Sequence, residues 1–454
     1  MKLLISNFVL LTSLFTCFVA EIKAYYDVNM PGNFKNPQAV SEVLSGNRKT
    51  ANAAWWGFEP NDSTFALQSA INSGATKVIV PYMGNDWIVR PILLQSNQEI
   101  YIEPGVNIVA KKGYFKKTGD CLFNAINKKN ILLQGYGTTL KMQKTDYANT
   151  EQYEKSEWRM GIRLLSCEAV NIKGITVKDT GGDGLYIGES DSGKSCKNIF
   201  IENCIFDNNY RQGISIISAE KLRISNCIFN NTSGTNPSAG IDIEPNNNKN
   251  KLSDIVIQDC ISKNNAGAGF VVSLKQLDAN SENVSILFYN CYIEGCKWGL
   301  VVSSEDKDSP KGLVEFRNCC IENSISPGIW ISIDKREFNT VFSNCTLRNC
   351  AQDYSFDKMR NSPVRVRGGR SGKNDSVGAI VFSNLYIFDN TDRPKLFCYF
   401  WPGSSEGKNE NVSGNIFYNS EQKEKIIDTN IRIGLRTKII DYNPKIHKVE
   451  MVDK

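Results

Sequence analysis

Histidine is almost absent from this chain of 454 residues, which contains a single one, His447. Mechanisms that rely on an imidazole within the repeated part of the chain are therefore excluded, and an acid or base there must be a carboxylate, Lys, Arg or Tyr. No Cys-x2-Cys pair is present either. That spacing is typical of zinc sites, so we expect no zinc centre.

The sequence also lacks a strong charge bias and long internal apolar runs. Its net charge of +5 is small, and no basic segment with interleaved aromatics is present, which disfavours nucleic acid as a partner. The Gly181-Gly-Asp-Gly segment does not open a helix, so it is not a nucleotide fingerprint. Beyond the N-terminal segment, no stretch reaches the ~18 apolar residues that a membrane span requires.

Residues 1–24 combine a basic start with an apolar run, a pattern that predicts a secretory signal peptide. Cleavage is expected after Ala20 or Ala24. The mature protein is then secreted or periplasmic. Leu14-Phe-Thr-Cys17 is similar to a lipoprotein box, but the apolar Phe18 that follows argues against it, so a cell-surface lipoprotein is the less favoured alternative.

What the sequence does contain is a repeat. From the middle of the chain onward, a glycine followed by alternating apolar residues recurs every 27 to 30 residues. A fixed period of this size indicates a solenoid, and the period-2 alternation indicates strands. The repeated glycines are Gly184, Gly213, Gly240, Gly269, Gly299 and Gly328.

A second motif follows each glycine strand: an apolar-x-apolar run that ends in Asn-Cys or a close variant. Asn also recurs four residues after the cysteine, replaced once by Gly295. Because Asn tolerates left-handed backbone, this position predicts a turn that stacks from coil to coil. Similar side chains at equal positions predict parallel strands about 4.8 Å apart. The cysteines of the motif are Cys204, Cys227, Cys260, Cys291, Cys319 and Cys345.

With these motifs the chain resembles the pectate-lyase-like superfamily of right-handed parallel β-helices. Residues 62–72 resemble the amphipathic helix that caps the first coil in many members, with Asp62 or Thr64 as N-cap. The apolar face of this helix comprises Ala66, Leu67, Ala70 and Ile71. The resemblance covers about residues 55–400 and implies an all-β, right-handed parallel β-helix with an N-terminal capping helix. It leaves the reaction open, because the superfamily holds lyases, hydrolases, epimerases and non-enzymatic adhesins.

The predicted organisation is one elongated domain with small additions. The signal peptide covers 1–24, an N-terminal segment with the capping helix 25–90, the β-helix 91–400 and a C-terminal tail 401–454. Most cysteines fall on one ladder, where free Cys is a good small core filler, so we expect buried thiols. Cys296 and Cys350, one residue past the Asn position, are the better candidates for a disulfide.

The outward positions of the glycine strands predict where a functional site lies. Residues two and four after each glycine should point away from the core. Polar residues concentrate at or beside these positions in the coils at Gly161, Gly184, Gly213 and Gly240, and later coils carry fewer. The predicted patch is four coils tall, roughly 15 Å. It comprises Arg159, Arg163, Asp183, Tyr186, Glu189, Arg211, Gln212, Ser215, Asp242 and Glu244.

Asp242-Ile-Glu244 is the most specific element of this patch. Carboxylates at i and i+2 of a strand project on one side, about 6.6 Å apart along the chain. Glycosidases use two carboxylates, as acid and as base or nucleophile. The pair is similar to the arrangement in β-helical carrageenan hydrolases. Ion pairs with Arg211 or Arg163, or calcium binding, are the alternatives.

Asp183 is expected two coils from this pair, about 10 Å along the axis, where it could assist catalysis. Its segment, Asp179-Thr-Gly-Gly-Asp183-Gly, resembles the Asp-containing turn of polygalacturonase-like hydrolases. The paired Asp and the His of that family are missing here, and Gly-Gly-Asp-Gly is also an ordinary turn sequence.

Cationic residues of the patch point to an acidic polymer. Arg159, Arg163, Arg211 and Lys275 could hold carboxylate or sulfate groups, or could serve solubility and ion pairing. Tyr186, Gln212 and Ser215 complete the predicted substrate-binding set. A basic segment over 359–370 interrupts the repeat and is expected to line the groove or to be plain surface. Trp330 could stack on a sugar face.

The sequence therefore predicts an exported polysaccharide-degrading enzyme, a glycoside hydrolase acting on an acidic or sulfated polymer. Asp242, Glu244 and Asp183 are its predicted catalytic residues, and no cofactor is expected. Two alternatives remain open. One is a calcium-dependent polysaccharide lyase with Arg211 or Lys275 as base and the three carboxylates holding the ion. The other is a non-catalytic glycan-binding protein. The active form is expected to be a monomer.

Overall fold

The computed structural model describes residues 34–304, 309–332, 337–353, 362–367, 379–389, 398–401, 412–419 and 435–441. The predicted signal peptide and His447 lie outside these residues. The chain divides into two compact units. The first runs up to Tyr186 and includes Asn198–Tyr210, and the second holds Ile187–Lys197 and the chain from Arg211 onward. No helix within the described residues is long and apolar enough to cross a membrane.

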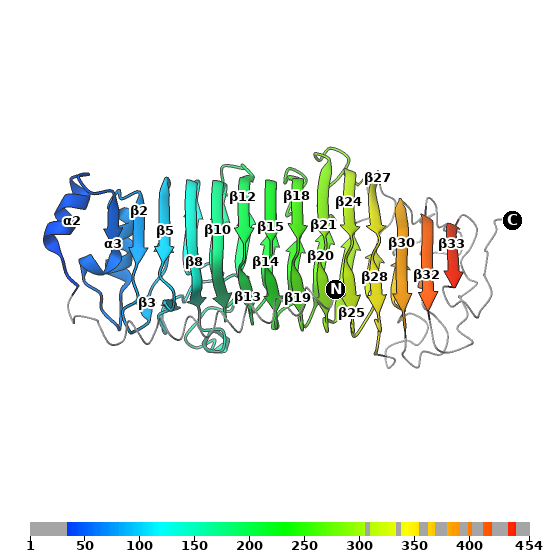
Figure 1. Cartoon of the computed structure of the whole chain (residues 1–454), viewed down its shortest axis with the longest axis horizontal. Coiled ribbons are helices and arrows are strands. Elements are labelled where there is room, and N and C mark those ends of the chain that lie inside the picture. Colours follow the sequence, from blue (N-terminus) through cyan, green and yellow to red (C-terminus); the bar gives the residue numbers. More distant parts are fainter. Residues whose placement is uncertain are drawn as a thin grey trace. The chain divides into compact units, whose positions relative to one another are not determined.

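The first unit begins with two short helices, α2 (Pro37–Leu44) and α3 (Thr64–Asn72), beside strand β2 (Figure 1). A 3-10 helix, η1 (Ala53–Trp56), lies between them in sequence. Helix α3 confirms the predicted capping helix, since its buried residues are Ala66, Leu67, Ala70 and Ile71. Its N-cap is Ser63, between the two residues predicted for that position.

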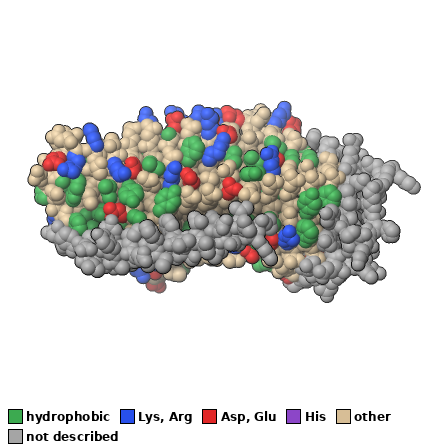
Figure 2. Space-filling model, in the orientation of Figure 1, with side chains coloured by type: hydrophobic (Ala, Val, Ile, Leu, Met, Phe, Trp, Pro, Cys, Tyr) green, Lys and Arg blue, Asp and Glu red, His purple; other side chains and the backbone are tan. Residues whose placement is uncertain are grey.

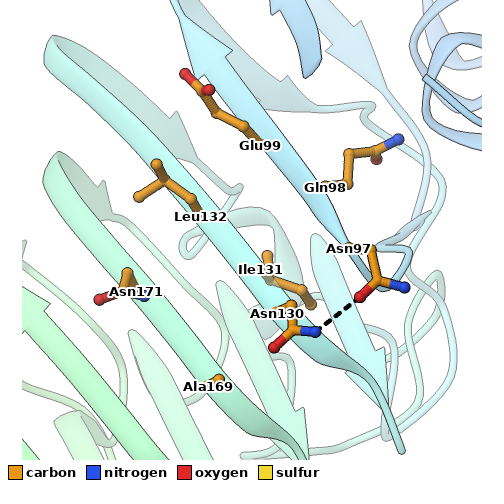
Figure 3. A pocket seen from close by; sticks show the side chains of 8 residues that line it. All are labelled: Asn97, Gln98, Glu99, Asn130, Ile131, Leu132, Ala169 and Asn171. Carbon is orange, nitrogen blue, oxygen red and sulfur yellow. Dashed lines mark hydrogen bonds between the residues drawn. The ribbon is translucent and has the colours of Figure 1, made fainter. Parts of the chain in front are cut away.

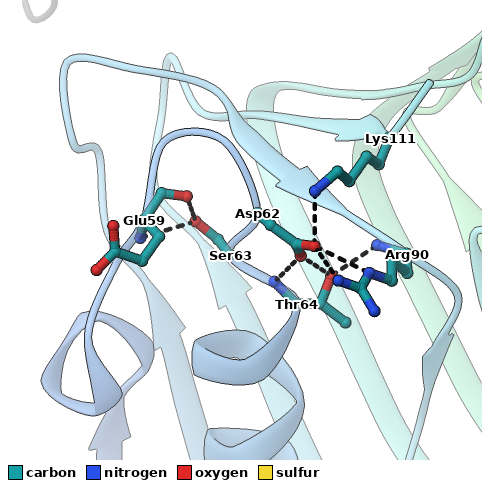
Figure 4. Close-up of polar contacts among 6 residues, drawn as sticks. All are labelled: Glu59, Asp62, Ser63, Thr64, Arg90 and Lys111. Carbon is teal, nitrogen blue, oxygen red and sulfur yellow. Dashed lines mark hydrogen bonds and ion pairs between the residues drawn. The ribbon is translucent and has the colours of Figure 1, made fainter. Parts of the chain in front are cut away.

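Asp62 acts one residue before this N-cap. Its carboxylate accepts hydrogen bonds from the Thr64 amide at 3.2 Å and the Thr64 hydroxyl at 2.5 Å. It also forms ion pairs with Arg90 at 2.6 Å and Lys111 at 2.8 Å (Figure 4). Asp62 therefore ties the start of α3 to two neighbouring strand ends.

The remaining elements of the first unit are strands and one 3-10 helix. They are β1 (Thr50–Asn52), β2 (Lys77–Val80), β3 (Trp87–Val89), β4 (Ile92–Leu93), β5 (Gln98–Ile102), β6 (Asn107–Ala110), β7 (Phe123–Ile126), β8 (Lys129–Lys141), η2 (Asp146–Ala148), β9 (Ile162–Leu165), β10 (Glu168–Lys178) and β13 (Ile205–Asp207). Strands β11 (Leu185–Gly188) and β12 (Cys196–Glu202) contain residues of both units. Strand β1 pairs in parallel with β2, β2 with β5, and β3 with β6. The stack of parallel strands therefore begins before the predicted boundary at residue 91.

The second unit repeats three strands per coil. Its strands are β14 (Gln212–Ile216), β15 (Ala219–Ser225), β16 (Ile228–Asn230), β17 (Ala239–Ile243), β18 (Leu252–Gln258), β19 (Ile261–Lys263), β20 (Ala268–Ser273), β21 (Val284–Tyr289), β22 (Tyr292–Glu294), β23 (Trp298–Ser303), β24 (Lys311–Arg317), β25 (Cys320–Glu322), β26 (Ile329–Ser332), β27 (Glu337–Ser343), β28 (Thr346–Arg348), β29 (Val364–Arg367), β30 (Ile380–Phe388), β31 (Cys398–Trp401), β32 (Val412–Asn419) and β33 (Leu435–Asp441). Each strand pairs in parallel with its counterpart in the next coil, as β18 does with β21 (Figure 1). The pairing of β32 with β33 extends beyond residue 400, where a tail was predicted.

The interior of the second unit is a set of ladders. Phe270, Phe288, Phe316, Phe342 and Phe382 stack with neighbouring ring centroids 4.8 to 5.5 Å apart. The predicted ladder of buried thiols is confirmed over the described residues. Twelve cysteines there, Cys296 and Cys350 included, are free and buried, so the disulfide considered for those two is not formed.

The turns between strands follow the Asn motif. The residue before each cysteine of the ladder and the residue four after it adopt φ values between 48° and 63°. In the second unit these residues are Asn226, Asn231, Asp259, Asn264, Asn290, Gly295, Asn318, Asn323, Asn344 and Asn349. Stacked side chains at these turns bond one another, since Asn290 Nδ2 donates to Asp259 Oδ1 at 2.5 Å. The predicted left-handed Asn turns are confirmed.

One outer face of the second unit, the paired-charge face, carries β18, β21, β24 and β27 together with β19, β22, β25 and β28. Side chains of opposite charge on neighbouring strands lie close together there. Lys263 is 2.9 Å from Glu294, and Arg348 is 3.2 Å from Glu322. Figure 2 shows basic and acidic side chains intermixed along the strands that face the viewer. These charges are balanced between adjacent coils.

Candidate functional site

A groove of about 400 Å³ lies on another outer face of the second unit, formed by β14, β17, β20, β23 and β26. It holds both members of the predicted carboxylate pair. Its lining residues are Arg211, Asn236, Pro237, Asp242, Glu244, Ala268, Val271, Ser273, Lys275, Trp298, Val301, Ser303 and Trp330. The size falls in the range of ligand-binding clefts, roughly 300–1,000 Å³.

The parallel register aligns this face into rows. One row runs Ser215, Asp242, Val271, Val301, Trp330 and Arg365 from strand to strand, and all of these except Arg365 lie two residues after a glycine. A second row runs Ser273, Ser303, Ser332 and Arg367. Glu244 precedes Ser273 in that row, because Ile243 pairs with Val272. Ile241 and Ile243 are fully buried, while the carboxylates on either side of Ile243 line the groove, as the alternation predicted.

The two carboxylates occupy different depths. Asp242 is 1% exposed, and its Oδ2 accepts a hydrogen bond from Gln212 Nε2 at 2.9 Å. Gln212 is itself oriented by the Ala239 amide, which donates to Gln212 Oε1 at 2.8 Å. The Glu244 side chain is 42% exposed, and its Oε2 lies 3.9 Å from Arg211 Nη2. The groove therefore has one carboxylate fixed in its floor and one at its mouth.

Two tryptophans, which we call the aromatic platform, form the next part of the groove. The rings of Trp298 and Trp330 lie 5.5 Å apart at 44°. Trp298 and Val301 pack on the small cluster of Ala239, Ala268 and Val271. Flat apolar rings beside polar groups are suited to the mixed faces of sugars. The sequence argument named Trp330 but missed Trp298, whose position before the glycine is occupied by Gln212 and Ala268 in other coils.

Buried side-chain atoms on β14, β20 and β26 have no hydrogen-bond partner within the described part of the chain. They are Ser273 Oγ, Ser215 Oγ and Trp330 Nε1. Buried donors are rarely left unsatisfied in native proteins. Of the three residues, Ser273 and Trp330 line the groove, where a hydroxyl-rich ligand could complete their bonding.

Arg159, in the first unit, is placed differently from its prediction. It was expected to face outward, but it is fully buried. Its guanidinium donates to the main-chain oxygens of Phe115 at 2.7 Å and Lys116 at 3.0 Å, and also to that of Glu154. Arg159 thus joins two loops from inside, and its side chain is not at the surface where a polymer could reach it.

The other first-unit candidates also differ in exposure. Asp183, expected to point outward, has no exposed surface, and its main-chain oxygen accepts from the Gly161 amide at 3.0 Å. Arg163 is half-buried and donates to Asn124 Oδ1 at 3.0 Å. Tyr186 is half-buried on β11. The assisting role of Asp183 stays a prediction.

The remaining predicted residues belong to the second unit. Arg211 and Lys275 line the groove with the carboxylate pair. Gln212 and Ser215 are buried on β14, outside the lining of the groove. Within the described residues, no group of three or more His, Cys, Asp or Glu side chains is arranged to hold a metal ion. Of the predicted basic segment 359–370, the described part is 362–367, and the rest lies outside the described residues.

A second hollow, of about 390 Å³, lies in the first unit over β5 and β8 (Figure 3). An amide pair crosses it, with Asn130 Nδ2 donating to Asn97 Oδ1 at 2.7 Å. Its one acidic residue, Glu99, is 2.8 Å from Lys77. This hollow has no pair of carboxylates and therefore lacks the chemistry of the groove in the second unit.

Comparisons with known proteins identify the fold. A family model described as a right-handed beta helix region matches residues 142–284. No curated protein matches the chain by sequence. Similar solved structures include the tailspike of Escherichia coli bacteriophage HK620 in complex with a pentasaccharide, with TM-score 0.58, 12% identity, and 88% of this chain and 81% of that chain covered. Another is the exopolygalacturonase of Thermotoga maritima, with TM-score 0.57, 14% identity, and coverage of 86% and 96%.

The family 28 exopolygalacturonase of Yersinia enterocolitica is also similar, with TM-score 0.55, 12% identity, and coverage of 87% and 78%. Identities this low establish the fold alone. The prediction of a right-handed parallel β-helix is confirmed.

Proposed function

We propose that this protein is a carbohydrate-active β-helix that hydrolyses an acidic or sulfated polysaccharide, with Asp242 and Glu244 as its acid–base pair. One observation carries the proposal. Two carboxylates from one strand line a groove that also contains cations and an aromatic platform. Such a groove offers both the reactive groups and the binding surfaces that a charged sugar polymer requires.

The chemistry follows from the depths of the two carboxylates. Glu244, at the mouth, can reach a water molecule and accept its proton as the water oxygen attacks the anomeric carbon. Asp242, in the floor, donates a proton to the departing glycosidic oxygen, and Gln212 holds its carboxyl group in place. This single displacement by water would invert the configuration at the anomeric carbon.

The rest of the groove would bind the polymer. Arg211 and Lys275 are suited to carboxylate or sulfate substituents, which accept charge-assisted hydrogen bonds. Trp298 and Trp330 would pack on sugar faces. The similar solved structures support a polysaccharide ligand, since two are named as exopolygalacturonases and the third is a tailspike in complex with a pentasaccharide.

Elimination is the second candidate, because Lys275 lines the same groove as the carboxylates and could remove a proton beside a uronate carboxylate. A product screen distinguishes the possibilities. Uronate-containing, sulfated and neutral polymers are incubated with the protein, and reducing ends and ultraviolet absorbance are read together. New saturated reducing ends support hydrolysis, and absorbing unsaturated ends support a lyase. Binding without new ends would leave a non-catalytic glycan-binding protein.

Export is part of the proposal, based on the basic and apolar pattern of residues 1–24. Mass measurement of the protein purified from its own cells and medium tests it. A mature N-terminus after Ala20 or Ala24 is expected. An intact Met1 on the active protein would contradict export by this route.

A further inference from the structure

The groove face continues beyond the aromatic platform. Strand β29 pairs in parallel with β26, which places Arg365 opposite Trp330 and Arg367 opposite Ser332. The Arg365 guanidinium carbon lies 5.5 Å from the centre of the Trp330 ring. Both arginines are half-buried. The Arg365 guanidinium therefore borders the platform on the side away from the carboxylates, and Arg367 follows two residues later on the same strand.

Charge is distributed unevenly along these rows. Asp242 and Glu244 occupy one end, and Arg365 and Arg367 occupy the same rows four strands later. Between them the rows hold only apolar residues, tryptophan and serine, namely Val271, Ser273, Val301, Ser303, Trp330 and Ser332. At about 4.8 Å per strand, the acids and the arginines are separated by roughly 19 Å.

We infer that Arg365 and Arg367 form a distal subsite for an anionic substituent of the polymer, a uronate carboxylate or a sulfate ester. The inference rests on the proposed function in that the polymer must lie along the groove. Arginines at i and i+2 of one strand project on one side, and each planar fork can bind an oxyanion through two N–H groups. Because the Arg365 guanidinium lies beside the Trp330 ring, a sugar that contacts the edge of the aromatic platform could place its anionic group at the guanidinium.

This subsite would select long anionic chains. A polymer cleaved at the carboxylate pair reaches the arginines only if it extends over four strands beyond the pair. Short fragments and neutral chains would gain nothing from Arg365 or Arg367. The dependence on length separates this subsite from a general attraction between cations and polyanions.

Binding measurements on the full chain test the inference. Affinities are measured by titration calorimetry for a length series of oligogalacturonates, the same series after carboxyl reduction, and a length series of sulfated galactan oligomers. For Arg365→Gln and Arg367→Gln we expect about tenfold weaker binding of long members of one anionic series. Short anionic and neutral oligomers should bind as they do to the wild-type protein. The series that responds identifies carboxylate or sulfate.

Two further variants make the test specific. Arg348→Gln removes an arginine that also lies over an aromatic ring, at 4.5 Å from Phe388, but on the paired-charge face, and it should leave all affinities unchanged. Arg365→Lys keeps the charge without the fork, so an intermediate loss is expected. Thermal unfolding verifies that each variant is folded.

The outcomes separate this inference from the proposed function. Length-dependent binding that requires the arginines supports the subsite even if no polymer is cleaved. If cleavage depends on Glu244 while Arg365→Gln and Arg367→Gln bind long anionic oligomers as the wild type does, the subsite is refuted and the hydrolase stands. Equal losses for short and long oligomers, or no binding of any anionic oligomer, would also refute it.

Discussion

The two outer faces of the second unit use charge in different ways. On the paired-charge face, cations and carboxylates meet on adjacent strands, as Lys263 and Glu294 do at 2.9 Å. On the groove face, Asp242 and Arg365 share a row but are four strands apart. Charges balanced between neighbours contribute to the register of the coils. Charges spread along a groove match a ligand that itself spans several coils.

The largest expected effect is on activity. Glu244→Gln and Asp242→Asn should each lower kcat by about 10²–10⁴-fold, because each removes one partner of the proton transfer. The unfolding midpoint should change by no more than ~2 °C, since both changes are nearly isosteric. Glu294→Gln, on the paired-charge face, is the matched control and should keep full activity. Full activity in both groove variants would end the acid–base assignment.

A large effect on stability is expected when a ring is removed from the buried phenylalanine ladder of the second unit. The Phe316 ring is 4.8 Å from Phe288 and 5.2 Å from Phe342, and it is fully buried. Phe316→Ala should lower the free energy of unfolding by about 3–5 kcal/mol through lost burial and a cavity. Denaturant unfolding followed by circular dichroism measures it. Phe316→Leu should cost clearly less, and an equal cost would argue against cavity formation as the cause.

The aromatic platform should contribute to binding rather than to the chemical step. Trp330→Ala is expected to raise KM about tenfold with little change in kcat, because stacking is made equally in the ground and transition states. Trp330→Phe should recover most of the loss. A fall in kcat with unchanged KM would instead place Trp330 close to the reacting atoms.

The ion pairs of Asp62 with Arg90 and Lys111 predict that the stability of the protein depends on pH (Figure 4). Burial alone would raise the pKa of this carboxyl, but hydrogen bonds from Lys111, Thr64 and Arg90 outweigh it and hold the pKa well below its usual range. A lowered folded-state pKa contributes stability above about pH 4, which is lost as the pH falls toward the folded-state value.

Asp62→Asn should therefore be less stable than the wild type at pH 7, by about 1 kcal/mol for a partly exposed pair. Thermal unfolding of both proteins across an acid series measures the difference. The gap should narrow steadily below pH ~4. A gap that is constant with pH would mean that the charge of Asp62 contributes nothing.

The smallest effect is expected for a single pair on the paired-charge face. Lys263→Gln breaks the contact with Glu294 and should cost less than ~1 kcal/mol, because exposed ion pairs are weak. Added salt should reduce the difference further. A loss of activity in this variant would contradict the separation of the two faces.

The fold could be predicted because its determinants are local and repeated. Each Asn-Cys turn needs only a residue that tolerates positive φ. Asn226 and Asn231 are recognisable as such residues in the sequence, and both have positive φ in the structure. The row that contains Asp242 followed from the strand period once the glycines were aligned. Trp298 was missed because the position before the glycine holds different residue types in different coils, among them Gln212, Ala239 and Pro327, so the column gave no sign of a groove residue.

The repeat period did not predict how residues outside the strands are buried. Arg159 precedes β9 and forms an isolated bridge with Gly181, so the alternation rule that assigned it outward did not apply. The loops that accept its hydrogen bonds come from residues 115–116 and 154, whose paths the repeat does not specify. Asp183, in a turn before β11, is enclosed for a similar reason: a turn has no strand period to set its direction.

The parallel register of β20, β23 and β26 makes this architecture extensible. Copying the stretch from Gly269 to Trp298 would insert one complete turn whose edges match those already present on either side. Such a duplication would move the arginines about 4.8 Å farther from the carboxylates and leave the chemistry of both ends intact. The ligand length selected by the proposed distal subsite could thus change in evolution through the gain or loss of whole turns.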